Sequence, residues 1–344
     1  MVKRHCEFET NPTVTYSHTI GFLANQGRGF NNPVDLCLDN DGLLYVLNRA
    51  GPEVGIRLPY KRVTVCTKTG DYIREFGTGG TAPGEFWWPS SIAMSPEGTI
   101  FIADEALHRI SMFTEDGKFL GHWGKYGTDL GDLNRPSYIA FDQDAALCVS
   151  DSLNHRVQRF SNNGKFINSW GPATSGVNNL NMPWGIHSNA SDLYVCDWRN
   201  DRIVKWDSQG NAPLVLPLEN IDLSRPAHLT VTDSGDLVIA DWGNDRVVVA
   251  SASGSLIQIL VGESDDSNWA LEYFAANPDE RDQRHVANLH PLLSDRQLDR
   301  GEPSANTESL FWGPTSVQKD SKGSLYVVDS CRHRIQIYDQ TELP

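Results

Sequence analysis

The strongest constraint on the fold is an internal repeat. One pattern recurs about every 44 to 47 residues: a Pro, an apolar run, a tight turn, a second apolar run that ends in Asp, and then an Arg that opens a third run. The Asp and the Arg are five residues apart in every copy. The copies open at Pro89, Pro136, Pro183, Pro226 and Pro314, and their Asp–Arg pairs are Asp104–Arg109, Asp151–Arg156, Asp197–Arg202, Asp241–Arg246 and Asp329–Arg334.

Each copy predicts one four-stranded sheet. Three apolar runs fit three strands, and a fourth follows in phrases such as residues 119–124 and 166–171. A degenerate copy opens at Pro33, which brings the number of units to six. Units of this length stack radially into an all-β propeller, an arrangement that leaves few exposed sheet edges.

The ends of the chain are expected to close the ring. The last copy stops after its third strand, at Tyr338–Asp339, and the segment Thr13–Ile20 has the pattern of a missing outer strand. We therefore expect the N-terminal strand to complete the final blade. The whole chain, residues 1–344, is then one domain.

These copies resemble the NHL repeat, and the resemblance runs from about Thr13 to Asp339. It implies a six-bladed propeller. Among such propellers, the peptidyl-α-hydroxyglycine amidating lyases carry three metal-binding His, each directly after an opening Pro. None of the matching positions here is His, so the resemblance transfers no metal site and leaves the cofactor unknown; these positions are Val34, Ser90, Ser137, Trp184, Ala227 and Thr315.

Two insertions are expected on the same face of the ring. Residues 262–313 separate blades five and six, and nine extra residues around 51–61 follow the second strand of blade one. Within the longer insertion, residues 268–276 are expected to be helical, capped by Asp266 or Ser267 and ended by Pro278, and residues 286–293 to form a second short helix. We expect the insertion to form a lid over the mouth of the central channel.

Aromatic and charged side chains gather at the positions expected to surround that mouth. Aromatic walls with a few charged groups are typical of ligand pockets, although such Trp residues also pack between blades. The candidate ligand-binding residues are Arg49, Arg135, Trp184, Trp198, Arg225, Trp242 and Trp312. The candidate catalytic residues are His228 and Tyr138 for proton transfer, expected at the rim, with Asp35 or Glu105 as partner.

The repeated Asp residues are interpreted differently. A catalytic group is needed once per chain, so a carboxylate present in five copies is expected to hold turns and to pair with the Arg of its own copy. His108, His155 and His333 precede three of those Arg residues, and we expect them to be structural as well.

The composition narrows the function. With 29 basic and 44 acidic residues the net charge is −15, of which the insertion supplies −7, so nucleic-acid binding is disfavoured. No run resembles a membrane span or a secretion signal, and the Cys spacings predict no disulfide framework or zinc clip, which favours a cytoplasmic location. We expect a monomer that binds a small polar or aromatic molecule, with lyase- or hydrolase-type chemistry open, and a non-catalytic protein-interaction scaffold as the alternative.

Overall fold

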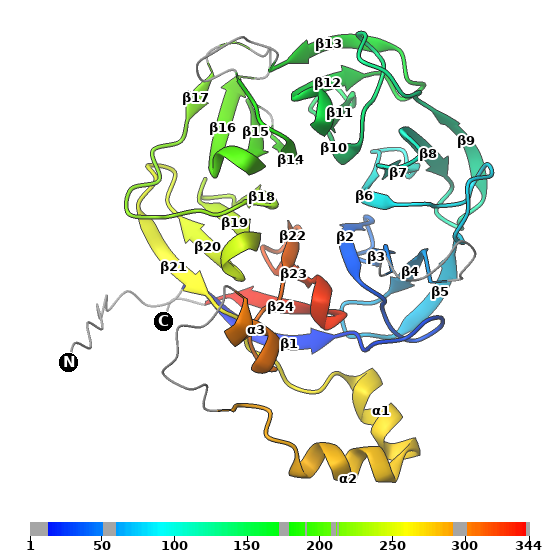
Figure 1. Cartoon of the computed structure of the whole chain (residues 1–344), viewed down its shortest axis with the longest axis vertical. Helices are drawn as coiled ribbons and strands as arrows, with labels where there is room; N and C mark the ends of the chain where they lie inside the picture. Colours follow the sequence, from blue (N-terminus) through cyan, green and yellow to red (C-terminus); the bar gives the residue numbers. More distant parts are fainter. Residues whose placement is uncertain are drawn as a thin grey trace.

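Six four-stranded antiparallel sheets are arranged around a central axis (Figure 1). The computed structural model describes residues 13–50, 60–171, 179–189, 191–207, 211, 213–291 and 301–341. The blades consist, in chain order, of β2 (Pro33–Leu38), β3 (Leu44–Asn48), β4 (Arg62–Cys66) and β5 (Tyr72–Phe76); β6 (Pro89–Met94), β7 (Ile100–Asp104), β8 (Arg109–Phe113) and β9 (Phe119–Trp123); β10 (Pro136–Phe141), β11 (Leu147–Asp151), β12 (Arg156–Phe160) and β13 (Phe166–Trp170); β14 (Pro183–Ser188), β15 (Asp192–Asp197), β16 (Arg202–Asp207) and β17 (Leu214–Val215); β18 (His228–Val231), β19 (Leu237–Asp241), β20 (Arg246–Ala250) and β21 (Leu256–Leu260); and β22 (Pro314–Lys319), β23 (Leu325–Asp329) and β24 (Arg334–Gln340).

The sixth blade is completed by β1 (Val14–Ile20), which pairs antiparallel with β24. The register runs from Val14 opposite Gln340 to Ile20 opposite Ile335. Tyr16 and Tyr338 also make an edge-to-face contact across this pair. The predicted closure of the ring is confirmed.

The two faces of the ring differ in their turns. The inner strands β2, β6, β10, β14, β18 and β22 line the axis, and in most blades the inner strand begins at the repeat Pro. We call the face where they begin the motif face, because the turns after the repeat Asp lie there. They end at the hairpin face, where short turns such as Asp39–Gly42 connect them to the second strands.

The core lies between neighbouring blades. Alternate strand residues pack against the next sheet, and six apolar clusters each join two adjacent blades. In the cluster between blades one and six, Leu36 and Val46 pack with Val328 and Ile335. Apolar contact around the full circle therefore holds the ring.

The insertion between blades five and six contains α1 (Asn268–Ala276), α2 (Pro278–Val286) and α3 (Glu302–Asn306). The side chain of Ser267 accepts a hydrogen bond from Ala270 N–H, as a helix N-cap does. The predicted helix and its cap at Ser267 are therefore correct. The second helix ends, rather than begins, at Val286, because Pro278 fits the first turn of a helix as well as it ends one; residues 292 and 293 lie outside the described part of the chain.

The position of the described helices differs from the expected lid. In Figure 1, α1 and α2 lie outside the ring, beside β1, and not over its centre. The buried Trp269 of α1 packs edge-to-face on Phe30 at 5.3 Å between ring centroids, which ties the helix to the outer part of the ring. The short α3 lies closer to the motif face, where Arg332 donates to the carbonyls of Ser304, Ala305 and Thr307.

Candidate functional site

The repeat Asp residues hold the turns of the motif face. Asp151 is fully buried; it accepts hydrogen bonds from the N–H of Asn134 and the side chains of Asn154 and Gln158, and it pairs with Arg156 at 2.7 Å. The same pair recurs at 197–202, 241–246 and 329–334. Asp104 instead accepts four backbone N–H groups, while Arg109 donates to carbonyls of residues 81, 82 and 85. The structural interpretation is supported by these contacts.

The residues that precede the repeat Arg link each blade to the next. His108, His155 and His333 adopt left-handed backbone conformations, and Nδ1 of each ring accepts a backbone N–H from the following blade at 2.9–3.1 Å. In blades four and five a carboxylate oxygen of Asp201 or Asp245 takes this place. These hydrogen bonds therefore join neighbouring blades at the motif face, in addition to the apolar clusters between the blades.

The predicted catalytic residue Asp35 lies at the centre of a buried network. Its carboxylate accepts hydrogen bonds from Ser91 and Ser316 at 2.7 Å and from Tyr138 at 2.9 Å. It also accepts the N–H of Ile92, on the open edge of the next inner strand, at 3.0 Å. Burial raises the pKa of Asp35, and these donors oppose the rise. The network joins the inner strands of blades one, two, three and six.

His228 lies in the same network, stacked on Tyr138 with ring centroids 4.4 Å apart. Only 2 % of His228 is exposed, so the expected position at the rim is wrong. Its Nδ1 accepts the N–H of Val317 at 3.3 Å, and Nε2 lies 3.3 Å from the carbonyl of Ile186. Burial lowers the pKa of His228 to about 3, so the ring is neutral at pH 7.

The fold therefore brings the predicted residues Asp35, Tyr138 and His228 together. Their polar atoms, however, are hydrogen-bonded to other groups of the protein. Asp35 and His228 each accept a backbone N–H from the free edge of another inner strand, and Tyr138 holds the Asp35 carboxylate in place. For proton transfer to a substrate, the His228 ring would have to leave two main-chain partners. The structure favours a role for these three side chains in joining blades, and their catalytic role stays a prediction.

Arg49 and Glu105 form a charged pair on the motif face. They follow the second strands of blades one and two and pair at 3.3 Å, with their side chains 15 % and 9 % exposed. The Arg49 guanidinium lies 4.2 Å from the ring centroid of Trp88. Burial raises the pKa of Glu105 and lowers those of Arg49 and the neighbouring Lys61, because each charged form loses water.

Three Trp residues form a continuous wall on the opposite blades. Trp184 and Trp198 lie 5.6 Å apart between ring centroids, and Trp198 and Trp242 lie 6.1 Å apart. Arg225 is exposed, and its guanidinium lies 5.1 Å from Trp198 and 6.0 Å from Trp242. All three rings are partly exposed. Four of the predicted ligand-binding residues are thus brought together.

The remaining predicted residues make other contacts. Trp312 is 37 % exposed, and it contacts Arg332 on blade six at 5.5 Å. Arg135 is exposed at the start of blade three, where its backbone N–H is held by His108. Among the described residues no group of three His, Cys, Asp or Glu side chains could hold a metal ion.

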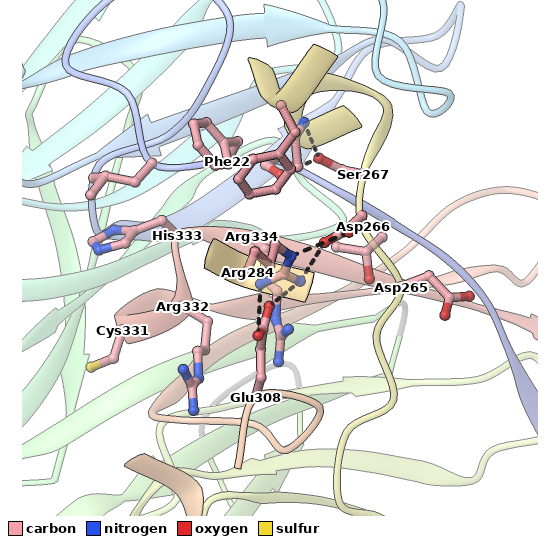
Figure 2. Close-up of a pocket in the computed structure, with 15 residues that line it drawn as sticks. Phe22, Asp265, Asp266, Ser267, Arg284, Glu308, Cys331, Arg332, His333 and Arg334 are labelled. Atoms are coloured by element: carbon pink, nitrogen blue, oxygen red, sulfur yellow. Dashed lines mark hydrogen bonds and ion pairs between the residues drawn. The ribbon is translucent and has the colours of Figure 1, made fainter. Parts of the chain in front are cut away.

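A cavity of about 300 Å3 lies under the insertion, at the outer part of the ring (Figure 2). Phe22 and Phe274 line its apolar side. On the other side, Arg284 of α2 pairs with both Asp266 and Glu308 and joins the two ends of the insertion. None of the predicted ligand-binding residues lines it. The sequence lacked a signal for this cavity, because it forms between segments that are distant in the chain.

A second cavity, of about 220 Å3, occupies the hairpin-face end of the channel. All six inner strands line it, and the Tyr138–His228 stack and Gln318 lie at its inner end. The alternation of the inner strands could have indicated which side chains face the axis. It could not show which end of the channel stays open, because that depends on how far the Asp35 network fills it.

These features define a six-bladed β-propeller. The NHL repeat family model matches residues 311–338, which include β22, β23 and most of β24 of blade six. No curated protein matches the sequence.

Solved structures share the fold at low sequence identity. A catalytically inactive virginiamycin B lyase from Staphylococcus aureus with quinupristin has a TM-score of 0.54 and 15 % identity, over 92 % of this chain and 98 % of that one. A streptogramin B lyase structure has a TM-score of 0.54 and 14 % identity, over 94 % and 97 %. At such identities the likeness concerns the fold alone. In the part of the chain that the structure describes, no helix has the length and apolar character to cross a membrane.

Proposed function

We propose that this propeller binds a small organic anion with a planar aromatic part at its motif-face mouth. The Trp wall with Arg225 is the observation that carries the proposal. Partly exposed rings offer a flat apolar surface, and a guanidinium beside them can pair with a carboxylate. A small ligand fits these separate side chains better than a protein partner, which needs a broad continuous interface.

Charge on the opposite side of the mouth supports an anionic ligand. Arg49, Lys61 and Arg135 lie on blades one to three, and Glu105 is the carboxylate that pairs with Arg49 there. Because Arg49 and Lys61 are largely removed from water, an anion near them is screened less than at an open surface.

Binding can be tested with 2-naphthoate and its neutral counterpart, 2-naphthalenemethanol. Trp198→Leu and Arg225→Ala should each weaken 2-naphthoate binding about tenfold or more, a change of about 1.4 kcal/mol, in isothermal titration calorimetry. Arg281→Ala, at an exposed Arg of α2, is the matched control. Equal binding of acid and alcohol, or unchanged binding by both variants, would contradict the proposal.

A chemical step on the bound ligand is the second candidate, and Glu105 is the observation that favours it. A largely buried carboxyl with a raised pKa beside a ligand mouth is typical of an acid–base group. The lyases among the similar structures agree with this class of chemistry but share the fold alone. Once a converted substrate is known, Glu105→Gln should abolish its turnover and keep its binding.

A further inference from the structure

The cavity at the hairpin-face end of the channel is separate from the motif-face mouth. It is lined by the second halves of the inner strands, including Cys37, Met94, Ala140 and Gln318. The buried Asp35 network closes its inner end, so the cavity is a blind pocket. Its volume of about 220 Å3 exceeds the ~150 Å3 cavity that accepts benzene in an engineered protein, so a one-ring molecule fits.

The electrostatics of this pocket oppose those of the motif face. None of the described residues that line it is Lys or Arg. Its imidazole groups, His187 and His228, have pKa values lowered by burial to about 4 and about 3, so they are neutral at pH 7. Lys319, whose charge acts on His187, is paired with Asp233. Nothing on the described wall attracts an anion.

A carboxylate occupies the first position of three of the six turns that follow the inner strands at this end of the channel. Asp39, Asp142 and Asp320 directly follow inner strands, and Oδ1 of each accepts two backbone N–H groups of its turn. In blade four the uncharged Asn189 also accepts two backbone N–H groups with its Oδ1, in a turn one residue shorter, so this side-chain role does not require a charge.

Asp39 is the carboxylate best placed to act on a ligand. It follows Cys37 and Leu38, which both line the pocket. Asp142 pairs with Arg159, whereas Asp39 makes no ion pair among the described residues. Asp39 itself does not line the pocket, and its Oδ2 accepts a long hydrogen bond from the Tyr45 hydroxyl at 3.5 Å, so its charge can act on a cation at the opening.

We propose that the hairpin-face end of the channel binds a small organic ammonium ion with an apolar body of about one ring. The apolar body contacts the side chains of Ile92, Met94 and Phe141. The ammonium group lies toward the opening, where the Asp39 carboxylate can accept its hydrogen bond.

Benzylamine, benzyl alcohol and benzoate test the proposal as a matched cation, neutral molecule and anion. With 13C-methyl-labelled Met, benzylamine should shift the Met94 signal, whereas Met112 and Met182, which do not line the pocket, are internal controls. Benzylamine should bind at least tenfold tighter than benzoate. Benzoate binding as tight as that of benzylamine, or an unshifted Met94 signal, would overturn the proposal.

Two variants test the place and the charge separately. Ala140→Phe fills the pocket and should weaken benzylamine binding at least tenfold, whereas Ala252→Phe, on an exposed turn of the same face, should not.

Asp39→Asn keeps the turn, as Asn189 does, and should reduce the preference for benzylamine over benzyl alcohol about threefold. Asp116→Asn, on an outer turn of this face, is its control. An unchanged preference in Asp39→Asn would remove the assigned role of that charge.

Discussion

At the scale of single residues, the buried charges of the repeat determine much of the stability. Asp151 has no exposed side-chain surface and satisfies four donors, of which the Arg156 guanidinium is charged. Removing one partner of such a pair leaves the other buried without compensation. The repeat therefore depends on both members of the pair being present.

Asp151→Ala should lower the free energy of unfolding by about 3–5 kcal/mol, because Arg156 and its neighbours lose their common acceptor. Urea unfolding followed by Trp fluorescence measures the change. Asp144→Ala is the control: this carboxylate also pairs with an Arg, but its side chain is 61 % exposed, and the cost should stay below about 1 kcal/mol. A cost for Asp151→Ala no larger than that of the control would contradict the structural role.

Three buried or partly buried His residues with lowered pKa values predict loss of stability in acid. The folded-state pKa values of His228 (about 3), His187 (about 4) and His333 (about 4) lie below the ordinary value of 6.5. Between those values the unfolded chain binds more protons, so the stability present above pH 6.5 is lost as the pH falls. Asp35, whose pKa is raised, acts in the opposite direction.

His228→Phe should remove part of this pH dependence. The slope of unfolding free energy against pH between 6.5 and 4 should fall by up to about 1.4 kcal/mol per pH unit, the contribution of one titrating group. Urea titrations at several pH values measure the slope. His285→Asn, at an exposed His of α2, should leave the slope unchanged, and an unchanged slope in His228→Phe would refute the assignment.

At the scale of elements, β1 is the closure of the ring. It pairs along its whole length with β24, and Val14 belongs to the apolar cluster between blades five and six. Deleting residues 1–22 removes that strand and leaves the edge of β24 open to other chains.

That deletion should lower the melting temperature by more than 10 °C, because a blade loses one of its four strands, and should cause oligomers to form. Differential scanning calorimetry and light scattering report the two effects. Deletion of residues 1–12 removes none of the described β1 pairs and is the control. A monomer with an unchanged melting temperature after deletion of residues 1–22 would contradict the closure.

The helices of the insertion show where sequence analysis was sufficient and where it was not. The cap at Ser267 was predictable from local chemistry. The place of α1 depends on Trp269 contacting Phe30, about 240 residues earlier in the chain, and no local pattern encodes that contact. The helices α1 and α2 therefore do not cover the channel as the expected lid would, although the chain position of the insertion was correct.

At the scale of the whole molecule, the number and order of the blades were predictable because the Asp–Arg spacing marks each copy. The depth of side chains along the axis was not predictable. His228 and Trp184 occupy neighbouring positions after their opening Pro, yet the first is buried on Tyr138 and the second is partly exposed. Which position faces the channel depends on irregularities in strand pairing, such as the register shift after Pro183.

The pairing of β1 with β24 also has a consequence for protein synthesis. The two strands are separated by about 320 residues, so the first strand of the propeller to leave the ribosome waits for a partner at the other end of the propeller. At roughly 5–20 residues per second the interval is about 15–60 s. During that time the nascent strand presents unpaired N–H and C=O groups to every other nascent chain. Slower translation prolongs this exposure, so the yield of correctly closed rings should depend on elongation rate and on chaperones that cover the emerging segment.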